Sequence, residues 1–137
     1  MKILIINGPN LNLLGKRNKE IYGSISFEDF LDELKFEDME ILYQQSNIEG
    51  ELISEMQNAS VDGIIINAGG YTHTSVAIRD CIEAISIPVI EVHISNIAGR
   101  ESFRHNSLIA PVCIGSIFGF GLRSYEMAID YFKKYGA

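Results

Sequence analysis

The chain has 137 residues, of which 47% are hydrophobic and 21% charged, and only 3 are prolines. This length and composition are typical of one globular domain with a buried core, and they argue against disordered, collagen-like and low-complexity proteins. With 18 acidic and 11 basic residues the net charge is −7, which argues against broad binding to nucleic acid or to an anionic membrane. The partner we expect is a small molecule. A small carboxylate or phosphate is compatible with the net negative charge, because a few cations that converge in a cleft can bind it while distant charges are screened.

Five short runs of apolar, mostly β-branched residues recur along the chain, and such runs predict β-strands. They lie at residues 3–6, 39–43, 63–66, 87–93 and 112–118.

Helical periodicity follows each of the first two strands. Residues 27, 30, 31 and 34 are apolar and follow Ser26, which can cap the first turn together with Asp29. A second helix, with Leu52 and Met56 on its apolar face, follows a similar capping box at Ser46 and Glu49.

Two further helices complete the pattern. Residues 76–85 form a helical stretch after the polar cluster at residues 72–75, and apolar residues at 122, 125, 129 and 132 stripe a last helix that ends in Lys133 and Lys134. The order is therefore βαβαβαβαβ.

Strands that are apolar on both faces require helices on both sides of a parallel sheet. The sequence predicts an α/β, flavodoxin-like three-layer sandwich with a five-stranded parallel sheet, which binds its ligand beyond the carboxyl ends of the strands.

The sequence carries no sign of export or of a membrane span. The apolar run at residues 3–6 is too short for a signal peptide, and the charge-free stretch at 105–122 is interrupted by Pro111 and three glycines. Cys81 and Cys113 lie in apolar patterns without a Cys-x-x-Cys spacing, so we interpret them as buried reduced thiols. We expect a cytoplasmic protein.

The loop after the first strand superficially resembles a phosphate-binding loop. Six residues separate Gly8 from Gly15, and Lys16 is followed by Arg17, whereas a P-loop has four residues between its glycines and a Ser or Thr after its lysine. A nucleotide triphosphatase is therefore excluded. On its own this segment is also compatible with an ordinary polar turn.

Polar residues also follow the third strand, at 67–75, where they open a helix whose N-terminal amides suit an anion or a hydroxyl-rich ligand. His73 and Asp80 are seven residues apart, which predicts that both lie on one helical face. Ordinary helix capping and two solvated polar side chains are the alternatives.

The fourth strand ends in Glu91, His93 and Ser95, which alternation places on one side of the chain. A carboxylate two residues before a histidine can orient the ring and favour its protonated form. Arg100 and Arg104 follow just past the end of this strand, where they could bind a substrate carboxylate. The alternative is a structural histidine in the core, paired with a structural acid.

Other chemistries fit the sequence poorly. The three histidines have neither HxH nor HxxxH spacing, so we expect no metal site. Lys16 and Lys19 lie among other charges, which disfavours a Schiff base. A phosphoacceptor domain of this topology needs acids where the chain has Asn7 and Asn67.

Several motifs in the same order together resemble the type II 3-dehydroquinate dehydratases over nearly the whole chain. They lie at residues 7–15, 21–23, 45–47, 49–51, 67–69, 72–75, 79–80, 91–96 and 103–104. The resemblance implies a single catalytic domain over residues 1–137. It also implies a shikimate-pathway lyase that removes water from 3-dehydroquinate to give 3-dehydroshikimate, with no metal and no cofactor.

The resemblance also assigns catalytic roles. Tyr22 is implied to be the base that takes the C2 proton, and Arg17 is implied to lower the pKa of the Tyr22 phenol. One guanidinium at about 4 Å supplies roughly 4 kcal/mol, which is enough to lower that pKa by two or three. Asn10 is implied to hold a water that stabilises the enolate. His93, held by Glu91, is implied to protonate the departing hydroxyl.

Substrate contacts and assembly follow from the same resemblance. The implied substrate-binding residues are Asn67, His73 and Arg104 for the ring hydroxyls, Ile94 and Ser95 for the carboxylate, and Asp80 from across a subunit boundary. The family forms trimers grouped into dodecamers, so we expect a homo-oligomer. A flavodoxin-like module that binds flavin or another small anion is the alternative function.

Overall fold

Five parallel strands form one sheet in the computed structural model, which describes residues 1–16, 20 and 24–136. The strands are β1 (Lys2–Asn7), β2 (Glu40–Gln45), β3 (Gly63–Asn67), β4 (Val89–His93) and β5 (Gly115–Phe118). Their order in the sheet is β2-β1-β3-β4-β5. The predicted five-stranded, flavodoxin-like architecture is confirmed, and each predicted run overlaps one of these strands.

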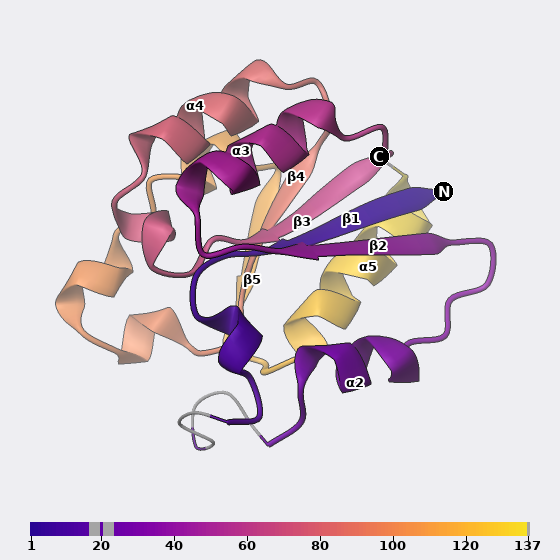
Figure 1. Cartoon of the computed structure of the whole chain (residues 1–137), viewed down its shortest axis with the longest axis horizontal. Helices are drawn as coiled ribbons and strands as arrows, with labels where there is room; N and C mark the ends of the chain where they lie inside the picture. The colour runs from indigo at the N-terminus through magenta and orange to yellow at the C-terminus, as the bar shows by residue number, and fades with distance from the viewer. Residues whose placement is uncertain (17–19, 21–23, 137) are drawn as a thin grey trace.

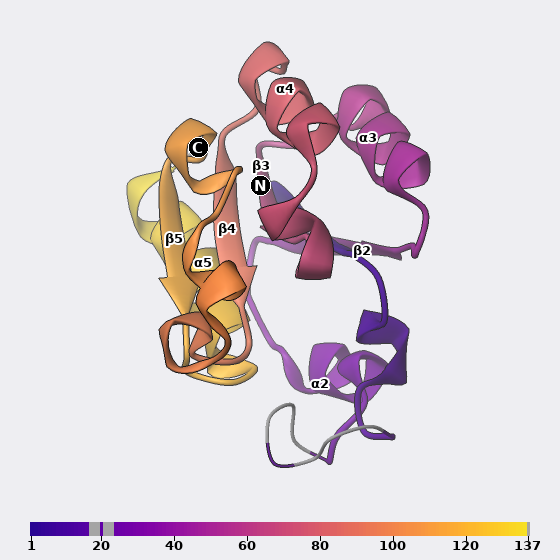
Figure 2. The ribbon, with the colours of Figure 1, turned by 90° about the vertical axis from the view of Figure 1, so that its left-hand side faces the viewer.

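Helices cover both faces of the sheet. Figure 1 shows α3 (Glu49–Asn58) and α4 (Val76–Ala84) on one face, and α2 (Phe27–Glu33) and α5 (Arg123–Tyr135) on the other. Short 3-10 helices gather near the carboxyl ends of the strands, as Figures 1 and 2 show. They are η1 (Leu11–Leu13), η2 (Gly69–His73), η3 (Ile97–Gly99) and η4 (Ser102–His105), while η5 (Ala110–Val112) precedes β5.

The two layers of core follow from the alternation of side chains along the strands. Ile3 and Ile5 of β1 pack in the cluster shared with α2 and α5, whereas Leu4 and Ile6 pack in the cluster shared with α3 and α4. Burying one such side chain contributes about 1.5–3 kcal/mol. A strand that is apolar at every position therefore needs a helical layer on each side, as predicted.

One of the two predicted helix caps is confirmed and the other is wrong. The Ser26 hydroxyl accepts a hydrogen bond from the Asp29 amide at 3.1 Å and so caps α2. The box at Ser46 and Glu49 does not form, because α3 begins after Ile48 and the Ser46 hydroxyl instead accepts from the Ile48 amide at 3.0 Å. The same hydroxyl donates to the Glu51 carboxylate.

The predicted common helical face of His73 and Asp80 is also wrong. His73 ends η2, whereas Asp80 lies in α4. Ser75 between them has an extended backbone with φ −94° and ψ 99°, so the regular 100° advance per residue does not run from one residue to the other.

Both cysteines are free thiols; Cys81 is buried as predicted, but Cys113 is only half-buried. Within residues 1–16, 20 and 24–136, none of the helices combines the length and apolar character that crossing a lipid bilayer requires.

A close backbone approach joins the ends of β1 and β3. The Gly8 amide donates to the Asn67 carbonyl at 2.7 Å, and a Cβ on Gly8 would lie 2.6 Å from the Ala68 carbonyl oxygen. Only glycine fits this contact, because a methyl group would push the two following loops apart.

We predict that Gly8→Ala lowers the free energy of unfolding by about 1–3 kcal/mol, as expected when a group is forced into packed backbone. Urea denaturation measures the change. Gly50→Ala in α3 is the matched control, since a Cβ there meets nothing within 4 Å and alanine favours the helix. Equal stability of the Gly8→Ala variant and the unchanged chain would contradict the prediction.

Candidate active site

A cavity of about 140 Å³ opens where β1, β3 and β4 end, which is the edge of the sheet predicted to bind the ligand. Its lining comes from the last residues of β3 and β4, from the loops after the three strands, and from η1, η2, η3 and η4. The lining residues are Pro9, Asn10, Leu11, Asn67, Gly69, Gly70, His73, His93, Ile94, Ser95, Ile97, Arg100 and Arg104.

Eight of the residues singled out from the sequence therefore surround one cavity: Asn10, Asn67, His73, His93, Ile94, Ser95, Arg100 and Arg104. Glu91 lies directly behind His93. Asp80 is exposed on α4, apart from this lining. Arg17 and Tyr22 lie outside the described residues.

His93 is held by Glu91, its neighbour on the same side of β4. His93 Nε2 lies 2.8 Å from Glu91 Oε2, and both side chains are buried. Their pairing confirms the prediction that Glu91 and His93 lie on the same side of β4. None of the hydrogen bonds among the described residues uses His93 Nδ1, so this nitrogen is left for a ligand in the cavity.

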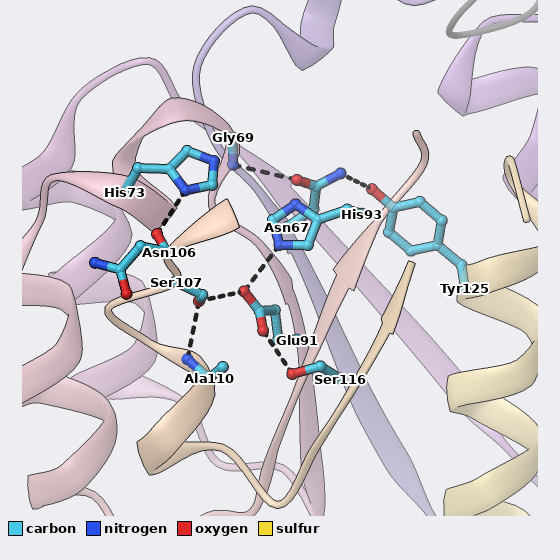
Figure 3. A network of polar contacts seen from close by, with 10 residues as sticks. All are labelled: Asn67, Gly69, His73, Glu91, His93, Asn106, Ser107, Ala110, Ser116 and Tyr125. Atoms are coloured by element: carbon cyan, nitrogen blue, oxygen red, sulfur yellow. Dashed lines mark hydrogen bonds and ion pairs between the residues drawn. The ribbon is translucent and has the colours of Figure 1, made fainter. Parts of the chain in front are cut away.

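Two serines complete the environment of Glu91 (Figure 3). Ser107 donates to Glu91 Oε2 at 2.7 Å and Ser116 of β5 donates to Oε1 at 2.5 Å. The Ser107 oxygen accepts from the Ala110 amide at 3.0 Å, which leaves its own proton for the carboxylate. Three donors from three segments thus converge on one anion.

These contacts decide the charge of Glu91, which is 1% exposed. Burial raises the pKa of the carboxyl group, but the hydrogen bond and charge of His93, with the bonds from Ser116 and Ser107, outweigh it and hold the pKa below its ordinary value. An ionised Glu91 favours a proton on the facing His93 nitrogen.

A second histidine lies against the first. His73 Nδ1 is 2.9 Å from the Asn106 carbonyl oxygen, and its ring is stacked on that of His93 with centroids 6.4 Å apart. Because a carbonyl only accepts, Nδ1 carries the proton, and Nε2 of a neutral His73 is an acceptor. The His73 ring can therefore accept a hydrogen bond from a hydroxyl group.

Arginines give one wall of the cavity a positive charge. Arg100 donates to the Ser95 hydroxyl oxygen at 3.2 Å, which leaves the Ser95 proton to be donated elsewhere. Arg104 is paired with Glu101 through a 3.2 Å contact from Nε. Guanidinium and hydroxyl donors side by side suit a carboxylate.

Asn10 is held by the loop that follows β2. Its backbone is left-handed, with φ 70°, and its amide donates to Asn47 Oδ1 at 3.0 Å. Gln45 Nε2 also donates to Asn47 Oδ1, at 3.2 Å, and the Tyr71 hydroxyl donates to the Asn47 carbonyl at 2.9 Å. The strand-two loop thus fixes one side of the cavity.

Sequence reasoning missed the residues that support the site from a distance. Ser107 and Ser116 carry no local spacing signal, because they meet Glu91 only through the β4–β5 register and the preceding loop. Tyr125 was interpreted only as part of an apolar stripe, yet its hydroxyl bonds to Asn7 and Asn67.

Other hollows lack this combination of groups. A larger one, of about 540 Å³, lies at the opposite ends of the strands and has Lys2 and Asp62 as its charged lining residues. Among the residues that the structure describes, no three His, Cys, Asp or Glu side chains gather as metal ligands would. Groups suited to acid–base chemistry meet at the cavity beside His93.

We predict that Ser116→Ala raises the pKa of Glu91 and, at pH 7, lowers the free energy of unfolding by about 1–3 kcal/mol, the cost of a bond to a buried charge. A carboxylate with a lowered folded pKa stabilises the fold above its ordinary pKa, and this contribution is lost as the pH falls through the folded value. In the variant, the loss should be complete at a higher pH, because the folded pKa of Glu91 lies closer to its ordinary value.

Urea denaturation across this pH range measures both effects, with Ser86→Ala as the control because Ser86 is exposed. The difference between Ser116→Ala and the unchanged chain should narrow as Glu91 becomes protonated. A difference that does not depend on pH would assign Ser116 a packing role only.

Comparison with known proteins gives one consistent result. The model of the family described as Dehydroquinase class II matches residues 1–133. A curated 3-dehydroquinate dehydratase from Exiguobacterium sp. is 55% identical over 133 residues, covering 94% of this chain and 92% of the relative. One from Caldicellulosiruptor bescii is 54% identical over 140 residues, covering 97% of each chain.

Solved structures agree in fold as well as in sequence. The crystal structure of type II dehydroquinase from Butyrivibrio crossotus matches with a TM-score of 0.93 and 51% identity, covering 97% of each chain. That of type II dehydroquinase from Propionibacterium acnes matches with a TM-score of 0.84 and 33% identity, covering 97% of this chain and 96% of the other. The chain belongs to the class II dehydroquinase family.

Proposed function

We propose that the chain is a 3-dehydroquinate dehydratase, a hydro-lyase that converts 3-dehydroquinate to 3-dehydroshikimate in the shikimate pathway without metal or cofactor. The observation that carries the proposal is the buried Glu91–His93 pair, 2.8 Å apart, at the wall of a small polar cavity. Family membership supports the same activity.

The reaction removes a proton from C2, next to the ketone, and a hydroxyl group from C1. Loss of the C2 proton leaves an enolate, whose electrons then form the C1–C2 double bond as the hydroxide departs. His93 supplies a proton so that water leaves instead. The ionised Glu91 supports this role because its Oε2 lies 2.8 Å from His93 Nε2 and so holds the ring in place at the cavity wall.

Tyr22 is the proposed base and Arg17 its activator. A phenol has an ordinary pKa of about 10, so it needs a nearby cation to be an anion at neutral pH. The support for these two roles is the sequence: Arg17 and Tyr22 follow Asn10, which lines the cavity, by seven and twelve residues, and both lie outside the described residues.

The remaining groups bind the substrate and the enolate. For the carboxylate, we assign the Ile94 backbone and the Ser95 hydroxyl, whose oxygen already accepts from Arg100. For the ring hydroxyls, we assign Asn67, His73 and Arg104, all at the cavity wall. Asn10 holds a water against the enolate oxygen, as preorganised donors do in other oxyanion sites.

A homo-oligomer, built as a dodecamer of four trimers, is also part of the proposal. Asp80 supports it because this carboxylate is exposed on α4 and stands apart from the cavity lining of its own chain, as expected of a residue that serves a neighbouring site. A monomeric mass in solution by light scattering would contradict this assembly.

The alternative function, binding of flavin or another small anion, fits the cavity less well. Arg100 and Arg104 in the cavity wall could hold a phosphate. The described lining, however, has no Phe, Tyr or Trp side chain against which an isoalloxazine ring could stack. A purified protein that carries a yellow chromophore would favour flavin.

We predict that the purified chain turns 3-dehydroquinate into a conjugated enone, seen as a rise in ultraviolet absorbance. The reaction should proceed in the presence of a metal chelator, because neither step requires a Lewis acid. Heat-denatured protein is the control. An unchanged absorbance at micromolar protein would refute the proposed function.

Two variants separate the two proton transfers. We expect Tyr22→Phe to abolish exchange of the C2 proton with deuterated water, because the base is gone. His93→Ala should retain exchange but lose elimination by about 10²–10⁴-fold, the usual contribution of a general acid. Nuclear magnetic resonance of the substrate measures exchange, and absorbance measures elimination. Exchange that survives in Tyr22→Phe would assign the base to another residue.

A further inference from the structure

A line of side-chain hydrogen bonds connects α5 to the wall of the cavity. The Gly69 amide donates to Asn67 Oδ1 at 3.2 Å, and Asn67 Nδ2 donates to the Tyr125 hydroxyl oxygen at 2.9 Å (Figure 3). The Tyr125 hydroxyl donates in turn to Asn7 Oδ1 at 2.7 Å, and Asn7 Nδ2 lies 3.4 Å from the Tyr43 hydroxyl. The line therefore joins β1, β2, β3 and α5.

The direction of this line is fixed at its Gly69 end. A backbone N–H can only donate, so the Asn67 atom that faces it is the oxygen, and the amide nitrogen faces Tyr125. Because the Tyr125 oxygen accepts from Asn67, its own proton is available for Asn7. A flipped Asn67 amide would place its NH₂ group against the Gly69 N–H and leave both donors unpaired.

Tyr125 is a rigid anchor for this arrangement. Its side chain is 0% exposed, and its ring packs edge-on against Phe27 with centroids 4.8 Å apart. Burial raises the pKa of the phenol, so the hydroxyl stays protonated. Asn67 is 3% exposed and lines the cavity, and no hydrogen bond among the described residues uses its second N–H.

We propose that Tyr125 is a positioning residue: its hydroxyl locks the Asn67 amide in the orientation that presents the second N–H to the cavity, as a donor to a substrate oxygen. Tyr125 is 58 positions from Asn67 in sequence and is not itself among the residues that line the cavity. This inference rests on the proposed function, since it deepens the role assigned to Asn67.

A double-mutant cycle tests the proposal. Tyr125→Phe should lower kcat/KM for 3-dehydroquinate by about ten-fold, mainly through a higher KM, because a loosened amide binds the substrate less well. In an Asn67→Ala background the same change should lower kcat/KM less than about two-fold, since no amide remains to be positioned. Independent, multiplying losses would overturn the proposal.

Tyr131→Phe is the matched control, because Tyr131 lies on the same helix but is exposed. Its kinetics should equal those of the unchanged chain. A melting curve for each variant shows whether it is folded at the assay temperature, so that a merely structural role of Tyr125, which would leave KM unaltered in folded protein, is recognised.

A measurement on the unchanged chain keeps the proposal testable if Tyr125→Phe does not fold. The Asn67 side-chain proton that is donated to Tyr125, followed by nuclear magnetic resonance without substrate, should exchange with deuterated solvent more slowly than the second proton on the same nitrogen, which faces the cavity. Rapid exchange would overturn the positioning role. This readout is independent of activity, so a protein without dehydratase activity but with a protected amide would refute the proposed function and not the hydrogen-bond lock.

Discussion

The burial of the Glu91 carboxylate is the constraint on which the site depends. An anion that is 1% exposed would be unstable in a protein interior without donors around it. Those donors come from three segments: His93 on the same strand, Ser107 between η4 and η5, and Ser116 on β5. Ser116 reaches Glu91 only when β5 has joined the sheet, so the charge of Glu91 and the folding of the edge strand are linked.

What the sequence could predict was local or periodic. Apolar strands alternating with helical stripes are sufficient to give the parallel sheet, because each layer must bury one face of every strand. Glu91 and His93 are two residues apart in a strand, so their common side follows from the pleat alone. The convergence of Asn67, His93 and their neighbours follows from the parallel arrangement, which brings the strand ends to one edge.

The features that the sequence could not predict depend on departures from regular helix geometry or on the register of elements far apart in the chain. The helical spacing of His73 and Asp80 fails because a 3-10 turn and the extended Ser75 intervene before α4. The capping box at Ser46 fails because α3 begins only after Ile48, so the Ser46 hydroxyl accepts from the Ile48 amide and not from the Glu49 amide. Ser116 and Tyr125 reach the site only through the packing of distant elements, and a polar atom on an apolar stripe gives no sign of its partner.

The polarity of the cavity explains how a chain of net charge −7 can accept an anion. Distant acids are screened beyond about 8–10 Å in physiological salt, whereas Arg100 and Arg104 lie in the wall itself. The nearer groups then distinguish one anion from another: Ser95 has a proton to donate, and Nε2 of a neutral His73 can accept one. Donors beside a cationic wall and an acceptor opposite favour a ring that carries both a carboxylate and hydroxyl groups over a bare phosphate, which has no proton to offer when fully ionised.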